Sequence, residues 1–191
     1  MPLDIGSICR PALGERMPGD DFTVVTRADA VLVAVADGLG HGEGAASAAH
    51  AITGLVRDEP DGPLDELMRK LGSAAARTRG AAVMLVRLDW HAHRLECCGV
   101  GNVHFQAVSH RSMHPVSAPG VVGHRVRKIV PYTFGLPSEL LFAVATDGLS
   151  SRIHLEKHAE GTAQKIAEEL LDHHGKVHDD ATCVVVRYEA D

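Results

Sequence analysis

The chain has 191 residues, of which 45% are hydrophobic and 23% charged; this is typical of one globular domain, here residues 1–191, and excludes a disordered or fibrous chain. Nineteen basic and 25 acidic residues give a net charge of −6, which disfavours nucleic acid and membrane surfaces as partners. No apolar run reaches the roughly 18 residues that a membrane-spanning helix needs, and no signal-peptide pattern is present. We therefore expect a cytoplasmic protein and favour a monomer.

The first half of the chain is expected to form a hairpin followed by two helices. Residues 22–27 and 30–37 are rich in β-branched side chains, and the second run, AVLVAVAD, is apolar on both faces, as in a buried central strand. Apolar residues recur at helical spacing over residues 42–56, and the pattern repeats over residues 64–71 after an Asp-Gly-Pro turn.

The second half returns to a strand pattern and contains one more clear helix. Short runs joined by turns with Gly, Asn or His predict an antiparallel meander, at residues 81–88, 94–98, 103–108 and 128–133. A buried apolar strand, a helix and a closing strand follow, at residues 140–146, 162–173 and 182–186. Because strands dominate and the helices are segregated into two pairs, we predict an α+β fold. It would be a four-layer α-β-β-α sandwich of two antiparallel sheets flanked by helix pairs.

Acidic residues stand at the ends of the predicted strands. Asp37 and Asp147 each end an apolar strand and precede a glycine. Asp179 and Asp180 directly precede the last strand, and Asp20 lies just before the first. A single Asp-Gly is typical of a turn, but strand ends that share one edge of the sandwich would bring their carboxylates together. Converged carboxylates repel one another unless a cation neutralises them, and oxygen ligands favour Mg²⁺ or Mn²⁺ over Zn²⁺.

Three segments together resemble one enzyme family. The strings VAVADGLGHGEGAASAA, LLFAVATDGLSS and HDDATCVVV occur in this order. They are similar to the motifs of the type 2C metal-dependent serine/threonine protein phosphatases, in particular the bacterial SpoIIE, RsbU and RsbX branch. The resemblance covers residues 14–187, and the ordered combination is more specific than any one motif. It implies a β-sandwich flanked by helices, the arrangement that periodicity also predicts.

The resemblance also implies roles for the acidic residues. In the family, the Asp of the first Asp-Gly bridges two metal ions and the Gly carbonyl binds one of them, which points to Asp37 and Gly38. The Asp of the second Asp-Gly and the first Asp of the terminal pair bind the other ion, which points to Asp147 and Asp179. Of the two remaining acids, Asp20 would hold a metal-bound water molecule, and Asp180 would lie outside the direct metal ligands.

The implied activity is hydrolysis of phosphoserine or phosphothreonine on a protein. Two cations, Mn²⁺ or Mg²⁺, would lower the pKa of a bridging water and neutralise the phosphoryl oxygens, so that no covalent phosphoenzyme is needed. With no sensor domain in the sequence, the likeness is greatest to the stand-alone stressosome phosphatase of the branch, whose substrates are phosphorylated STAS-domain proteins. Another phosphoprotein of a bacterial partner-switching pathway, an anti-sigma-factor antagonist, is the alternative substrate.

Three features depart from the family pattern or admit another interpretation. Many type 2C enzymes carry a phosphate-binding Arg before the first motif, and Arg16 is the candidate at an imperfect spacing. His41 is the candidate general acid, two residues later than the histidine of the family's eukaryotic members. Residues 40–45 match the G-x-G-x-x-A of dinucleotide-binding modules, but such a module needs a parallel strand after the helix, where residues 63–76 have helical periodicity.

Overall fold

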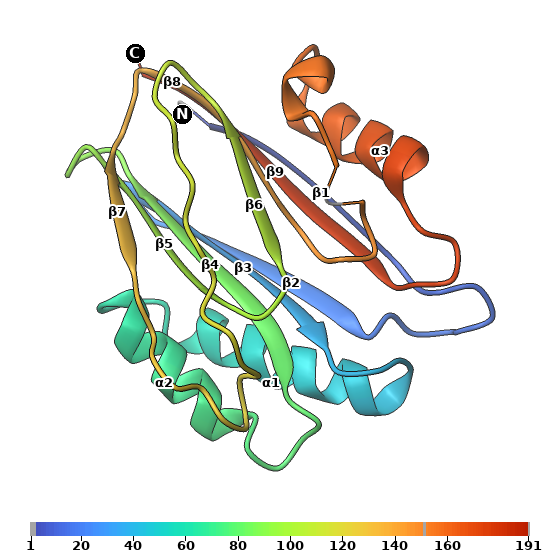
Figure 1. Cartoon of the computed structure of the whole chain (residues 1–191). Coiled ribbons are helices and arrows are strands. Elements are labelled where there is room, and N and C mark those ends of the chain that lie inside the picture. The colour runs from blue at the N-terminus through green and yellow to red at the C-terminus, as the bar shows by residue number, and fades with distance from the viewer. Residues whose placement is uncertain (1–2, 151, 191) are drawn as a thin grey trace.

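The computed structural model describes residues 3–150 and 152–190, which form two antiparallel sheets packed face to face between outer helices (Figure 1). The four-stranded sheet has the order β1 (Leu3–Arg10), β9 (Ala181–Glu189), β8 (Glu139–Ala145) and β6 (His104–Val108). The five-stranded sheet has the order β2 (Asp20–Thr26), β3 (Ala30–Gly38), β4 (Ala81–Asp89), β5 (Arg94–Val100) and β7 (Tyr132–Gly135). The outer elements are α1 (Glu43–Asp58) and α2 (Leu64–Ala74) on the five-stranded sheet, and α3 (Ala163–His174) and the 3-10 helix η1 (Leu155–His158) on the other. The predicted α+β sandwich is confirmed.

Alternation along β3 explains why its sequence is apolar on both faces. Val31, Val33 and Val35 point into the layer between the two sheets, whereas Leu32 and Ala34 pack under α1 and α2. All five are at most 3% exposed, and burial of a valine or leucine side chain contributes about 1.5–3 kcal/mol relative to exposure. β3 is thereby anchored along its length, which fixes the position of its C-terminal end.

The structure corrects several of the predicted elements. The sequence pattern does not indicate β1, because Gly6 is its one buried residue and a Cβ there would meet the backbone of Gln164 in α3 at 2.1 Å. β6 leaves the predicted meander and pairs with β8 in the other sheet. The strand expected at residues 128–133 is wrong over 128–131, since β7 begins at Tyr132. The second helix pair consists of α3 and the four-residue η1.

Strand direction excludes the dinucleotide-binding alternative. β3 and β4 are antiparallel neighbours, with Ala36 opposite Val83, whereas a dinucleotide module requires parallel strands before and after its helix.

Within residues 3–150 and 152–190, no helix combines the length and the apolar character that crossing a bilayer requires.

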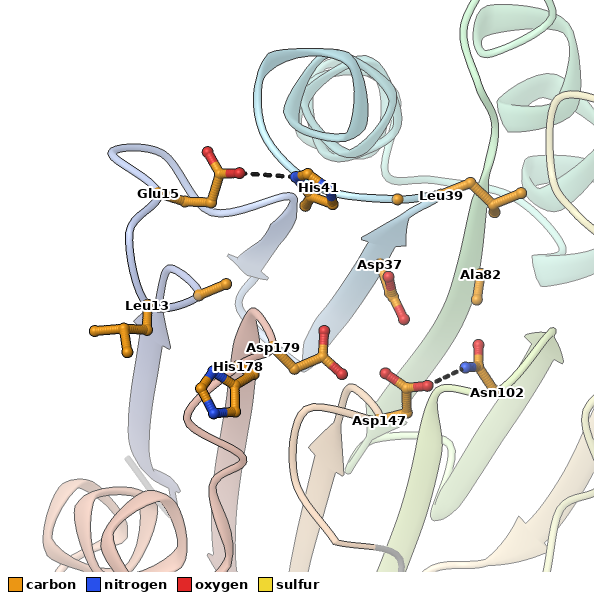
Figure 2. Close-up of a pocket in the computed structure, with 12 residues that line it drawn as sticks. Leu13, Glu15, Asp37, Leu39, His41, Ala82, Asn102, Asp147, His178 and Asp179 are labelled. Atoms are coloured by element: carbon orange, nitrogen blue, oxygen red, sulfur yellow. Dashed lines mark hydrogen bonds and ion pairs between the residues drawn. The ribbon is translucent and has the colours of Figure 1, made fainter.

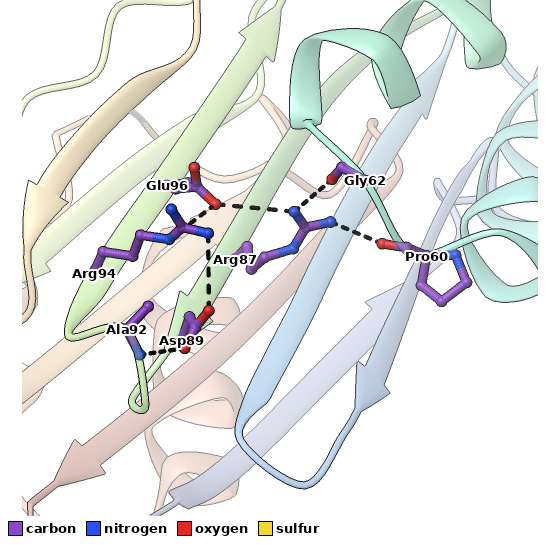
Figure 3. Close-up of polar contacts among 7 residues, drawn as sticks. All are labelled: Pro60, Gly62, Arg87, Asp89, Ala92, Arg94 and Glu96. Carbon is purple, nitrogen blue, oxygen red and sulfur yellow. Dashed lines mark hydrogen bonds and ion pairs between the residues drawn. The ribbon is translucent and has the colours of Figure 1, made fainter.

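A half-buried arginine fastens the α1–α2 connection to the sheet (Figure 3). Arg87 donates hydrogen bonds to the carbonyl oxygens of Gly62 (2.6 Å) and Pro60 (2.8 Å), and Glu96 on β5 faces it at 3.9 Å. Arg87 lies on β4 beyond Ala82, the partner of the β3 end in the β3–β4 register. This cluster therefore holds the helix layer at the end of the sheet away from the acidic residues.

Candidate metal centre

The strand ends bring acidic side chains to one end of the sandwich. The register of β2 and β3 sets Asp20 opposite Asp37, Asp147 follows the end of β8, and Asp179 precedes the start of β9. Figure 2 shows Asp37, Asp147 and Asp179 pointing toward a common space, a cavity of about 570 Å³ whose wall they share. The structure therefore places three of the four expected carboxylates on one cavity wall.

Two residues from distant segments hold Asp147 in place. Asn102 Nδ2 donates a 2.7 Å hydrogen bond to Asp147 Oδ2 (Figure 2), and the Lys176 ammonium group donates to the backbone carbonyl of Asp147. Asn102 also lines the cavity. Sequence reasoning missed both residues, because they lie 45 and 29 positions from Asp147 and no local motif marks them.

Asp20 and Asp180 lie behind the cavity wall. Asp20 is 3% exposed, and its Oδ2 accepts a 2.7 Å hydrogen bond from the Thr146 hydroxyl. Asp180 is also buried, and its Oδ1 accepts a 2.8 Å hydrogen bond from the Ala12 N–H, which ties the loop before β2 to the start of β9. Neither residue belongs to the cavity lining, so both are placed to act on the site through neighbouring groups.

Burial and mutual repulsion raise the pKa values of three acids at this end of the sandwich, Asp20, Asp37 and Asp179. The pKa of Asp37 is raised to about 8, first by burial and then by the charges of Asp20, Asp147 and Asp179. Burial raises the pKa of Asp20 to about 7, although the hydrogen bond from Thr146 acts in the opposite direction. Burial and the Asp147 charge also raise the pKa of Asp179. In the described part of the chain, no Lys, Arg or His forms an ion pair with any of these four carboxylates.

This set of donors fits hard divalent cations. Carboxylate oxygens without a counter-charge are the ligands that Mg²⁺ and Mn²⁺ prefer, and a cation among them would offset both the burial and the repulsion that raise the pKa of Asp37. As placed, no three His, Cys, Asp or Glu side chains among the described residues lie close enough to one point to enclose an ion. Mg²⁺ commonly keeps several water molecules and is held through one or two carboxylates, and the individual ligand roles stay predictions.

Space and chain reversal explain the glycines of the first motif. A Cβ on Gly38 would lie 2.1 Å from the carbonyl oxygen of Ala45 in α1 and 2.8 Å from that of Gly19, so only glycine lets β3 end this close to the helix. Gly40 (φ 87°) and Gly42 (φ 69°) then reverse the chain into α1 with left-handed backbone conformations that favour glycine.

The rim of the cavity carries His41 and an acidic partner that sequence reasoning missed. His41 Nδ1 lies 2.7 Å from Glu15 Oε1 (Figure 2), and since the carboxylate accepts, Nδ1 carries the donated proton. Both residues line the cavity together with Leu39. Arg16 is exposed and does not line the cavity, so the structure does not place this candidate at the site.

Comparison with known proteins identifies the family. Residues 27–189 match the family model described as Stage II sporulation protein E (SpoIIE). The chain belongs to the SpoIIE family. Phosphoserine phosphatase RsbX of Bacillus subtilis (strain 168) is 28% identical over 149 residues, which cover 75% of each protein.

Two solved structures extend this likeness to the whole fold. A crystal structure of RsbX in complex with magnesium matches with a TM-score of 0.89 at 23% identity, over 98% of this chain and 96% of the other. A structure described with the bacterial stressosome, a modular system adapted to control secondary messenger signalling, matches with a TM-score of 0.93 at 26% identity, over 97% and 99% of the two chains. The SpoIIE-family domain is a type 2C serine/threonine phosphatase domain, and the family uses Mg²⁺ or Mn²⁺. The predicted family, enzyme class and cofactor type are confirmed.

Proposed function

We propose that this chain hydrolyses phosphoserine or phosphothreonine on STAS-domain proteins of a stressosome. The observation that carries the proposal is the convergence of Asp37, Asp147 and Asp179 on one cavity, where no cationic side chain of the described residues pairs with them. A cavity of about 570 Å³ is large enough to admit a phosphorylated side chain, but its negative wall repels phosphate unless metal ions are bound.

The metal ligands of the proposal are residues of the cavity wall and its edge. Two divalent cations would be held by Asp37, the Gly38 carbonyl, Asp147 and Asp179, with Asp20 acting through a water molecule. When bound, the ions supply positive charge to the phosphoryl oxygens and lower the pKa of a water molecule that can attack phosphorus. The residues contribute the negative charge that holds two cations in one place, which explains why the wall of a phosphate site is acidic.

His41 is the proposed general acid. Its Nδ1–H is directed to Glu15, so in the imidazolium form Nε2–H is the proton that can pass to the departing serine oxygen as the P–O bond breaks. By accepting from Nδ1–H, the Glu15 carboxylate fixes the orientation of the ring and leaves Nε2 as the other nitrogen that can carry a proton. Glu15→Ala should therefore lower kcat for a phosphoserine protein with Mn²⁺, whereas Glu43→Ala, on the first turn of α1, should leave kcat unchanged.

The comparisons support the substrate class. RsbX is named a phosphoserine phosphatase, and the structure with the TM-score of 0.93 is described with the bacterial stressosome; stressosome STAS-domain proteins are accordingly the first substrates to test. A phosphorylated anti-sigma-factor antagonist of a partner-switching pathway is the second. We further propose that residues 1–191 form one phosphatase domain, which acts as a monomer in the cytoplasm.

Release of inorganic phosphate tests the function. The substrates are a STAS-domain protein phosphorylated on serine, a phosphorylated anti-sigma-factor antagonist and p-nitrophenyl phosphate, each with Mn²⁺ or Mg²⁺. We expect release that a chelator abolishes, that Asp37→Asn lacks, and that the exposed control Asp172→Asn retains. Release from none of the three substrates would show a binding protein with a phosphatase fold, and preference for the antagonist over the STAS protein would favour the alternative substrate.

A further inference from the structure

Large apolar side chains are exposed at the mouth of the acidic cavity. Leu13 is 71% exposed, Val177 is 54% exposed and Leu39 is 40% exposed. Leu13 and Leu39 line the cavity, to either side of the carboxylates in Figure 2. Val177 is next to Leu13, because the Leu13 N–H donates a 3.0 Å hydrogen bond to the Val177 carbonyl. These three residues, Leu13, Leu39 and Val177, are called the apolar rim.

Hydrogen bonds hold the backbone around the rim in place. The exposure of the rim side chains is therefore a fixed feature of the surface. On one side of Leu13 the Ala12 N–H donates to Asp180 (2.8 Å), and on the other the Glu15 N–H donates to the Ala12 carbonyl (3.0 Å). The Leu39 N–H donates to the Gly80 carbonyl at 2.9 Å. Surface apolar residues are ordinary when scattered, but a group of them around one cavity marks a binding surface.

We propose that the apolar rim binds apolar side chains next to the phosphoserine of a protein substrate, and so selects phosphorylated protein over small phosphoesters. The inference rests on the proposed function. A phosphoserine whose phosphate enters the cavity brings its neighbouring residues to the cavity mouth, where Leu13 and Leu39 belong to the lining and Val177 is hydrogen-bonded to Leu13. The carboxylates that line the cavity attract metal ions and give no attraction to an uncharged segment, whereas burial of apolar surface on the rim gives affinity for apolar flanking side chains.

Two phosphoserine peptides that differ only in their flanking residues test this proposal. One peptide carries leucine on both sides of the phosphoserine and the other carries serine. We expect wild-type protein with Mn²⁺ to have a kcat/KM about tenfold higher for the leucine peptide, and Leu13→Ser and Val177→Ser each to remove most of that preference. Val116→Ser is the matched control, because Val116 is 66% exposed but lies outside the cavity lining; it should keep the preference.

The outcomes separate this inference from the proposed function. Equal kcat/KM values for the two peptides, or loss of the preference in Val116→Ser but in neither rim variant, would overturn the rim proposal while leaving phosphatase activity established. No phosphate release from either peptide or from p-nitrophenyl phosphate would overturn the proposed function and the rim proposal together. If Leu13→Ser or Val177→Ser instead converted a dimer to a monomer in size-exclusion chromatography, the rim would bind a second copy of the chain and the substrate proposal would be wrong.

Discussion

Replacing Asp37 by asparagine should stabilise the metal-free protein while abolishing its activity. Burial and the neighbouring charges raise the pKa of Asp37 to about 8, against about 4 in an unfolded chain. Between these values the folded protein keeps a proton that the unfolded chain has lost, so the free energy of unfolding falls as the pH rises. One pH unit contributes about 1.4 kcal/mol, and the fall from pH 5 to pH 8 is up to about 4 kcal/mol.

Thermal unfolding in the presence of a chelator measures this difference. A change of 1 kcal/mol shifts the Tm of a chain of this size by about 2–4 °C. Between pH 5 and pH 8 the Tm of wild type should therefore fall by up to about 8–16 °C more than the Tm of Asp37→Asn. All other ionisable side chains are the same in both proteins, so the difference between the two slopes reports the Asp37 charge and its repulsion of the neighbouring acids. The exposed Asp172→Asn should keep the wild-type slope.

Metal ions should restore stability at pH 8 to wild type but not to Asp37→Asn. At pH 8, Mg²⁺ at about 100 times its Kd should stabilise wild type by about 2.7 kcal/mol and leave Asp37→Asn unchanged. The conclusion that burial and repulsion raise the pKa of Asp37 is refuted if metal-free wild type and Asp37→Asn lose stability equally between pH 5 and pH 8. Turnover of Asp37→Asn at the wild-type rate with Mn²⁺ would show that Asp37 is not a metal ligand.

Substitutions at Gly38, Arg87 and Thr146, with Gly54→Ala as a control, test the site and the scaffold that carries it. Gly38→Ala should lower the free energy of unfolding by about 3 kcal/mol and abolish activity, because the new Cβ overlaps a backbone carbonyl of α1. Gly54 has open space around a new Cβ, so Gly54→Ala should raise the free energy of unfolding by about 0.5–1 kcal/mol, as measured by chemical denaturation. Arg87→Ala should lower the free energy of unfolding by about 2 kcal/mol with kcat/KM unchanged, and a loss of activity in well-folded protein would contradict the assigned structural role. Thr146→Val removes the hydroxyl that donates to Asp20 and should lower the free energy of unfolding of the metal-free protein by about 2 kcal/mol. The loss should be larger at pH 8 than at pH 5, because the carboxylate form of Asp20 is the one that loses its donor. Equal losses at both pH values would contradict this.

The strands that end at the site could be predicted from sequence because they are buried on both faces. β3 and β8 are continuous apolar runs, and an acid followed by glycine marks where each one stops. β1 escaped prediction because it is an edge strand with one buried residue, Gly6. β6 was assigned to the wrong sheet because the residues of a strand show how it is buried and not which strand it pairs with.

The sequence by itself determined the layers of the fold, the order of the motifs and the acids Asp37, Asp147 and Asp179, because hydrophobic periodicity and turn residues act over a few neighbouring positions. Tertiary structure alone decided that Asn102 orients Asp147, that Glu15 pairs with His41, and that apolar side chains surround the cavity. Each of these is a contact between segments far apart in the chain. Such contacts depend on how the two sheets stack and on where the loops cross their ends, which no local pattern of residues encodes.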